Sequence, residues 1–311
     1  MRRVHVITEG AILLALYLAL MLFTLYVPIV GMVLLFVLPL PFILFSIRHD
    51  VASAIMLLIA GSILSVLFGS VWNILLTLIS GLSGLTMGVF YKRKQTMAVL
   101  IGGSLAYTAS FVVAYVGIIL FLQIDIIKDF IHLSKESLEQ SKSVITSISP
   151  DVNLEQQFEQ FEKGLDLLHI LTPTIFVLSG MTFAVLTHLV AVPVLKRLKV
   201  EVSQSKPFRE WRFPQSLVWY YLIVSVLVMI NSDTEGLYFM AIMNLYCMLQ
   251  FFVLIQGYSF VYFYSYVKGL SRAIPIIIVI ASILIPIFLY LVRILGIIDL
   301  SFPLREKIAK R

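Results

Sequence analysis

The chain has 311 residues, of which 60% are hydrophobic and only 13% are charged, and its mean hydropathy is +1.01. A soluble domain of this size does not need so much apolar surface, whereas a protein embedded in a lipid bilayer does. The formal net charge of +6 arises from basic residues in short connecting segments, as at cytoplasmic membrane flanks, and does not indicate nucleic-acid binding. The composition predicts an all-α, polytopic transmembrane helical bundle, because helices satisfy their own backbone hydrogen bonds in lipid.

Apolar segments of helix length follow one another along the whole chain. The first begins at Glu9, and no cleavage site followed by a polar domain comes after it, so we expect a retained membrane span. The segments have the boundaries 9–28, 30–47, 51–69, 71–91, 97–122, 168–195, 216–231, 237–267 and 273–298. The sequence therefore predicts eight or nine spans.

The distribution of Lys and Arg predicts the orientation of these spans. Basic residues occur at the N-terminus and after two, four, six and eight crossings, which the positive-inside rule assigns to the cytoplasm. They are Arg2, Arg3, Arg48, Lys92, Arg93, Lys94, six residues within 196–212, Lys268 and Arg272. The N-terminus is therefore expected in the cytoplasm.

The C-terminus does not fit this pattern. A ninth crossing by residues 273–298 would place the basic tail 305–311 outside. One interpretation is that the charge rule fails there. A second is that Pro275 and Pro286 break the segment into a kinked or re-entrant element, and a third is that the stretch 237–267 hides an extra turn.

The second segment, residues 30–47, is short and contains Pro39 and Pro41. These prolines predict a broken or strongly kinked helix whose free backbone groups are satisfied by neighbouring helices. Broken helices at membrane depth are typical of binding sites in transporters. A kink without a functional role is the alternative.

Residues 123–167 form the one long polar stretch, with nine acidic residues and four lysines. Apolar residues recur at helical spacing on both sides of Ser149 and Pro150. This pattern predicts an amphipathic helical hairpin over the outer mouth of the bundle, which would act as a lid or a docking surface. A solvated continuation of the fifth and sixth spans is the alternative interpretation.

Ala11, Ala15 and Ala19 recur at four-residue spacing in the first span, so a helix places them on one face. Such a face lets another membrane helix approach closely, because packing rather than hydrophobicity drives association in lipid. We expect these alanines to dock a partner helix, with packing inside the same chain as the alternative.

Polar residues inside the spans suggest two further features. Trp72 and Asn73 open the fourth span near the outer face and are candidates for a ligand pocket, although Trp72 also fits an interfacial anchor. Asn244, Gln250 and Gln256 lie at six-residue steps and so do not share one helix face. They predict separate interhelical hydrogen bonds rather than a continuous polar pore.

No motif for chemistry is present. The sequence lacks the zinc-protease, nucleophile-elbow and phosphate-loop patterns, and its five histidines are scattered over loops and different spans. We therefore expect no catalytic residues, no metal site and no cofactor.

The start of the chain, Thr8-Glu9-Gly10-Ala11 followed by Ala15 and Ala19, resembles that of the substrate-capture (S) components of energy-coupling-factor vitamin transporters. The kinked second span that follows adds to the likeness, which covers residues 8–195. The resemblance implies a six-helix bundle that captures a small molecule and docks a transmembrane coupling subunit through the alanines. The ligand-binding residues of that family do not carry over by any motif.

Over its whole length the chain resembles the YybS-like family of uncharacterised bacterial membrane proteins, through the same start, Pro39-Leu40-Pro41 and the motif at 211–214. This likeness implies a location in a bacterial cytoplasmic membrane. The expected organisation is an S-component-like bundle at 1–195 with the hairpin 123–167 inserted, a basic cytoplasmic loop at 196–215, and further helices with a basic tail at 216–311.

Two functions are compatible with the sequence. One is a non-catalytic component for the capture or transport of a small molecule, whose partners are the lipid bilayer, a transmembrane coupling subunit and an unidentified ligand. The other is a membrane scaffold or assembly factor that carries no transported ligand.

Overall fold

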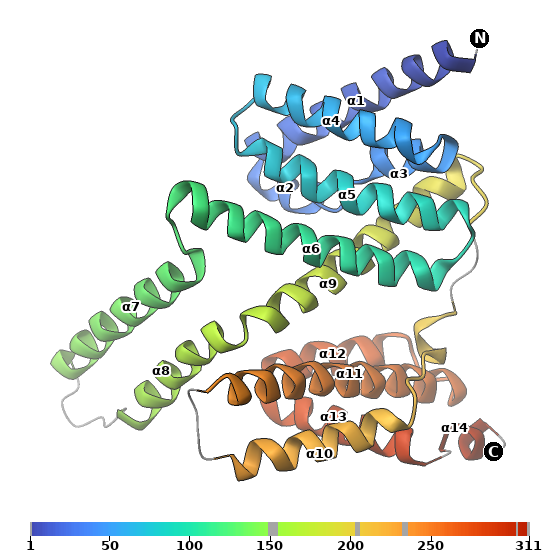
Figure 1. Ribbon diagram of the computed structural model, residues 1–311. Coiled ribbons are helices and arrows are strands. Elements are labelled where there is room, and N and C mark those ends of the chain that lie inside the picture. Colours follow the sequence, from blue (N-terminus) through green and yellow to red (C-terminus); the bar gives the residue numbers. More distant parts are fainter. Residues whose placement is uncertain (1, 149–154, 203–205, 232–235, 303, 310–311) are drawn as a thin grey trace. The chain divides into compact units, whose positions relative to one another are not determined.

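The computed structural model describes residues 2–148, 155–202, 206–231, 236–302 and 304–309. All regular elements in these ranges are helices (Figure 1), which confirms the all-α fold class. Within them, five helices are long and apolar enough to cross a membrane: Val4–Tyr26, Asn73–Lys92, Thr96–Leu122, Thr172–Arg197 and Leu237–Val267. Val51–Leu67, Ser216–Ile230 and Ala273–Leu284 are shorter apolar helices.

The chain divides into two compact units, which we describe separately. Unit 1 comprises residues 1–165 and 175–205, and unit 2 comprises residues 166–174 and 206–311. The helices in chain order are α1 (Arg2–Tyr26), α2 (Pro28–Leu34), α3 (Leu40–Arg48), α4 (Val51–Leu67), α5 (Asn73–Lys92), α6 (Thr96–Leu122), α7 (Ile126–Ile148), α8 (Glu155–Ile170) and α9 (Thr172–Arg197). They are followed by η1 (Phe208–Glu210), α10 (Ser216–Ile230), α11 (Leu237–Val267), α12 (Ala273–Leu284), α13 (Pro286–Ser301) and α14 (Leu304–Ala309).

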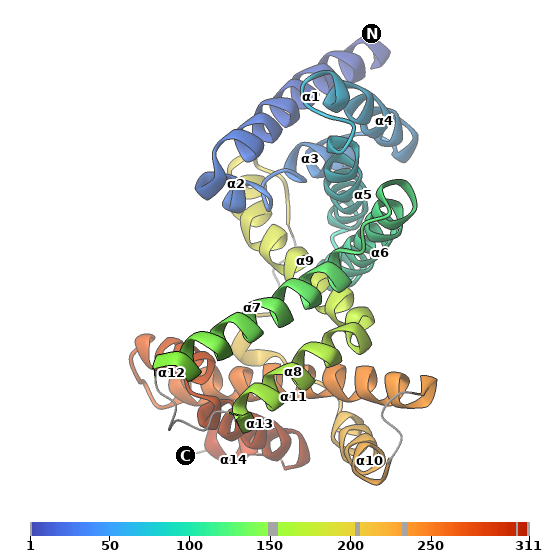
Figure 2. The same cartoon turned by 90° about the vertical axis from the view of Figure 1, so that its left-hand side faces the viewer.

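The short helix α3 forms the centre of unit 1. The expected break of the second segment is confirmed, because α2 ends at Leu34 and α3 begins only at Leu40. Every residue of α3 from Leu40 to Ser46 is buried. Figure 2 shows α3 enclosed between α1, α4 and α5. The broken segment is therefore part of the protein core.

Two glycines of α5 allow this close packing of α3. A Cβ atom at Gly84 would lie 2.6 Å from the carbonyl oxygen of Pro39, and one at Gly88 would lie 2.8 Å from that of Ile43. Any side chain at these positions would push α3 away from α5.

In unit 2, the long helix α11 and the helix α13 approach each other just as closely. A Cβ atom at Gly257 would lie 2.0 Å from the carbonyl oxygen of Val292, and one at Gly296 would lie 2.1 Å from that of Val253. The backbones of these two helices are thus in direct contact, as in membrane-helix pairs that cross at small residues.

The segment 273–298 is not one crossing helix. The first helix of this segment, α12, ends at Leu284. A second helix, α13, starts at Pro286, because proline lacks the amide hydrogen that would continue α12. The interpretation of an extra turn within 237–267 is wrong, since α11 is a single helix of 31 residues.

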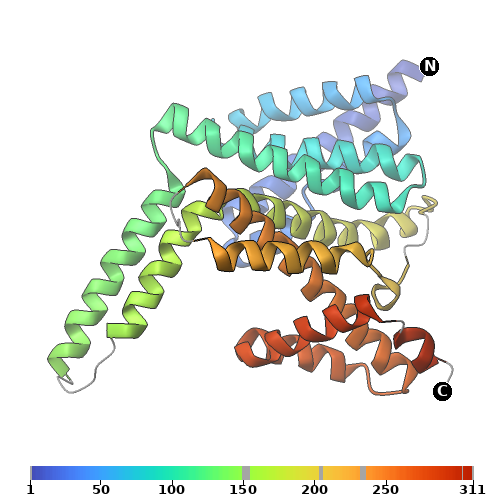
Figure 3. The same cartoon turned by 60° about the horizontal axis from the view of Figure 1, so that its bottom comes forward.

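Helices α12 and α13 together bring the chain back to the C-terminal end of α11. Gly296 of α13 lies against Gly257, and Arg305 lies over the ring of Phe263, so α13 runs in the same direction as α11. Helix α12 starts at Ala273, shortly after α11 ends, and runs back beside α11 in the opposite direction (Figures 1 and 3). Arg305 and Lys307 therefore lie at the same end of unit 2 as Lys268 and Arg272.

This return can be tested with single cysteine reporters in a chain that carries Cys247→Ala. We expect Ser271→Cys and Lys307→Cys to react with a membrane-impermeant maleimide from the same side of the membrane. Gly236→Cys, at the other end of α11, should react from the opposite side. Labelling of positions 271 and 307 from opposite sides would show that the C-terminal segment crosses once.

The close contact between α11 and α13 predicts that a single added methyl group destabilises the protein. Gly257→Ala should destabilise the protein by about 1–3 kcal/mol, because the methyl group overlaps a backbone carbonyl that cannot move alone. Gly164→Ala in α8 is the matched control, since nothing lies within 4 Å of the added Cβ, and it should be neutral or stabilising. Thermal unfolding of both variants in detergent measures the difference, and equal midpoints would contradict it.

Candidate functional site

Helix α1 has two faces of different character. Leu13, Tyr17 and Met21 are buried and belong to the core of unit 1. Ala11, Ala15 and Ala19 are exposed. Ala15 is two residues from both Leu13 and Tyr17, or about 200° around the helix, so the alanines lie opposite the packed face. Within unit 1, none of the described residues covers them.

The packed face of α1 is held by an aromatic contact and a hydrogen bond. The rings of Tyr17 and Phe42 meet edge to face, with centroids 4.9 Å apart. The hydroxyl of Tyr17 donates to Oγ1 of Thr77 over 2.8 Å. These contacts fix the rotation of α1 about its own axis, and with it the direction in which the alanines point.

An ionic cluster holds the N-terminal part of α1 in place. Glu9 accepts a hydrogen bond from Arg48, and its second oxygen lies 2.9 Å from Nε2 of His49. Lys92 donates to the carbonyl oxygen of His49 over 2.8 Å, which joins α5 to the same place. The exposed alanine face therefore begins at a point where α1, α3 and α5 are held together.

Trp72 and Asn73, the candidate ligand residues, are neighbours with different surroundings. The side chain of Trp72 is 45% exposed, whereas Asn73 is 7% exposed and its amide points toward the carbonyl oxygen of Ser65, 3.5 Å away. The carbonyl oxygen of Asn73 accepts from the hydroxyl of Thr77 over 2.8 Å. Asn73 is thus connected to Tyr17 through Thr77, a link that the sequence alone does not reveal.

Two buried pairs join α9 to the rest of unit 1. The hydroxyl of Tyr91 lies 2.6 Å from Nδ1 of His188, and the two rings are parallel within 4°. The hydroxyl of Tyr107 lies 2.8 Å from Oγ1 of Thr187. Because each polar group has a partner, these pairs help to position α9 against α5 and α6.

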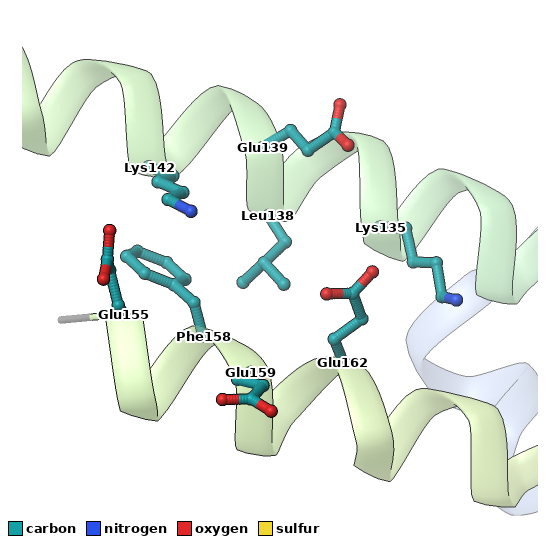
Figure 4. Close-up of a pocket in the computed structure, with 8 residues that line it drawn as sticks. All are labelled: Lys135, Leu138, Glu139, Lys142, Glu155, Phe158, Glu159 and Glu162. Atoms are coloured by element: carbon teal, nitrogen blue, oxygen red, sulfur yellow. The ribbon is translucent and has the colours of Figure 1, made fainter.

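Helices α7 and α8 occupy the stretch for which a helical hairpin is expected, and they lie side by side (Figure 1). A cavity of about 320 Å³ lies between them. Figure 4 shows Leu138 and Phe158 pointing toward each other across the gap, with charged residues around them. Glu159, which also lines the cavity, accepts a hydrogen bond from Lys163 over 2.7 Å, and this contact lowers the pKa of its carboxyl group.

The three amides of α11 bond to three different places, as their spacing predicts. Asn244 donates to the carbonyl oxygen of Ile170 over 2.7 Å. The amide oxygen of Gln250, turned toward α13, accepts from Arg293 over 2.6 Å. Gln256 donates to Asp299 over 2.5 Å. The prediction of separate interhelical hydrogen bonds is confirmed.

Arg305 is the centre of a buried ionic cluster in unit 2. Its Nε and Nη2 atoms donate to the two carboxylate oxygens of Asp299 over 2.9 and 2.6 Å. Its Nη1 atom donates to the carbonyl oxygen of Arg209 over 2.8 Å, and Nη2 also lies 3.2 Å from the hydroxyl of Ser259. Asp299 is completely buried and Arg305 is 9% exposed. We call Arg305, Asp299, Gln256 and Ser259 the Arg305 cluster.

With this geometry in hand, comparison with known proteins gives the family. Residues 15–300 match the family described as predicted membrane protein DUF2232. The chain belongs to this family. It is also 34% identical to the uncharacterized protein YybS of Bacillus subtilis (strain 168) over 308 residues, which is 99% of this chain and 100% of that protein. No solved structure matches the chain.

Membership of DUF2232 confirms the resemblance to YybS-like proteins and makes the chain a polytopic integral membrane protein. Neither description names an activity. The structure does not bring the alanines together with Trp72 and Asn73, because Ala11, Ala15 and Ala19 face away from the core that holds Asn73.

Sequence reasoning missed the Arg305 cluster of this DUF2232 protein. Arg305 looks like one of several basic residues in a solvated tail, yet it is buried against Asp299. The one available signal is Asp299 itself, an acidic residue at the end of an apolar segment with an arginine six positions later.

The Arg305 cluster should contribute strongly to stability. Asp299→Asn keeps the shape of the side chain but leaves the guanidinium of Arg305 buried without its counter-charge, which costs about 3–5 kcal/mol. Lys94→Gln is the control, because it breaks the exposed pair with Glu201 and should leave the unfolding midpoint unchanged. Thermal unfolding in detergent compares the two, and a wild-type midpoint for Asp299→Asn would contradict a structural role.

Proposed function

We propose that this protein is a non-catalytic component for the capture or transport of a small molecule, and that it docks a second membrane protein through α1. The observation that carries the proposal is the exposed alanine face of Ala11, Ala15 and Ala19. The resemblance of the first 195 residues to transporter S components supports the same assignment.

The surroundings of the alanine face fit a helix partner better than lipid alone. Ile12 and Leu16 are exposed beside it, so the row of small alanine side chains is flanked by larger side chains along one edge. Close helix approach lets many weak van der Waals contacts form at once, which is the main attraction between helices in a bilayer. A helix of the partner would pack against the row of alanines.

The rigidity of α1 also supports docking. Tyr17 holds α1 from the face opposite the alanines, and Glu9 holds α1 near its N-terminal end. A partner therefore meets a surface that is already in position, and binding does not have to order it first. A bacterial cytoplasmic membrane with the N-terminus inside would present the start of α1 to a partner at the cytoplasmic face.

A scaffold or assembly factor without a transported ligand is the second candidate. The filled interior of unit 1 favours it, because large side chains such as Tyr17, Phe42, Met87 and Tyr107 are almost completely buried there. In this alternative the exposed alanine face would still bind a partner, but no small molecule would accompany the complex.

Docking can be tested by photo-crosslinking in the membranes of the source organism. A photoreactive amino acid at Leu16, beside the alanines, should give one discrete adduct, whereas the same group at Ile59 on the exposed face of α4 should not. Ala15→Trp should reduce the yield from position 16 at least tenfold, because the bulky indole prevents close approach of the partner helix. The purified variant should keep its unfolding midpoint, since Ala15 is exposed.

An unchanged crosslinking yield in the Ala15→Trp chain would exclude docking through this face. Native mass spectrometry of the purified complex then separates the two candidates. A bound small molecule together with the partner supports capture or transport, whereas a partner without a small molecule supports a scaffold.

A further inference from the structure

Arg293 is placed within the apolar part of unit 2. It lies near the middle of α13 and faces Gln250, which lies near the middle of the membrane-span candidate Leu237–Val267. The amide oxygen of Gln250 accepts from both terminal nitrogens of the guanidinium, over 3.1 and 2.6 Å. A cation at such a depth is costly, and ionisable residues in membrane segments are usually functional.

The charge of Arg293 is not balanced by the protein. Among the residues that the structure describes, no carboxylate forms an ion pair with it, and its Nε–H group is buried without a hydrogen-bond partner. Arg305 in the same unit is the contrasting case, because Asp299 takes up its charge and its hydrogen bonds. Arg293 thus keeps both a free positive charge and an unused donor.

An aromatic ring lies beside this guanidinium. The ring of Tyr290 lies 4.9 Å from its central carbon. Tyr290 and Gln250 are both neutral, and their phenol and amide groups can donate hydrogen bonds to an anion.

The site is open on the outer side of α13. Arg293 is partly exposed, and Tyr290 and Ile294 on the same helix are 55% and 51% exposed. The exposed neighbours are apolar or amphipathic, as expected for a surface that meets lipid tails. A ligand would therefore reach the guanidinium from within the bilayer rather than from water.

We propose that Arg293, with Gln250 and Tyr290, binds the anionic oxygens of an amphiphile that is dissolved in the membrane. A guanidinium matches carboxylate and phosphate oxygens with two parallel hydrogen bonds, and such bonds are strongest where water is excluded. The acyl chains of the amphiphile would lie along the exposed face of α13. The site is independent of the alanine face of α1, so either proposal can fail without the other.

The test uses the full-length protein, purified in neutral detergent and stripped of lipid. Oleate and dioleoylphosphatidylglycerol are the probes, and dioleoylphosphatidylcholine, which has no net charge, is the reference. We expect native mass spectrometry titrations to show one-to-one binding of an anionic probe at least tenfold tighter than that of the reference. Preference for oleate identifies a carboxylate ligand, and preference for phosphatidylglycerol identifies a lipid phosphate.

Three variants decide whether Arg293 is responsible. Arg293→Gln should weaken binding of the preferred probe at least tenfold, because it removes the charge and the paired donors. Arg272→Gln is the matched control, with the same change of charge at an exposed position, and should bind as the wild type does. Arg293→Lys keeps the charge without the paired geometry and should bind several-fold more weakly, which covers the case in which Arg293→Gln does not fold.

Two results would overturn the proposal. One is binding of both anionic probes no tighter than that of phosphatidylcholine to the wild-type protein. The other is wild-type affinity in the Arg293 variants that fold.

Discussion

The structure depends on one constraint, which is that a helix broken inside an apolar protein needs another backbone close beside it. Both units meet this constraint with glycine. Pro39 precedes the short helix α3, whose carbonyl oxygens lie against Gly84 and Gly88 of α5. Pro286 starts α13, which lies against α11 at Gly257 and Gly296. Close contact with a long, unbroken helix holds each broken segment in place.

The same constraint accounts for the path of the C-terminal chain. Because Pro286 reverses the direction of the chain, α13 lies parallel to α11, and its end reaches the level of Ser259. Only there can Arg305 meet Asp299 and the carbonyl oxygen of Arg209. The proline break and the ionic cluster are therefore two parts of one arrangement.

Local features of this chain could be predicted from the sequence, and pairings between distant residues could not. Hydropathy predicted an all-helical membrane protein, Pro39 predicted the break before α3, and six-residue spacing predicted separate partners for the amides of α11. The contact of Tyr17 with Thr77 spans sixty positions and depends on how α1 turns against α5, which no periodicity encodes. For the candidate site, spacing put Ala11, Ala15 and Ala19 on one face, but only the packing of Leu13 and Tyr17 decides that this face points outward.

The choice of small residue differs between the buried helix contacts and the exposed face of α1. Gly84 and Gly257 are covered by another helix, so packing offsets the cost of about 1 kcal/mol that glycine imposes on a helix. The alanine face of α1 has no such cover within the described residues of unit 1. Alanine is the best helix former and still permits close approach of another helix, so α1 does not need a neighbour on this face to remain helical. Glycine therefore lies where a backbone is in direct contact, and alanine lies where the helix has to be stable on its own.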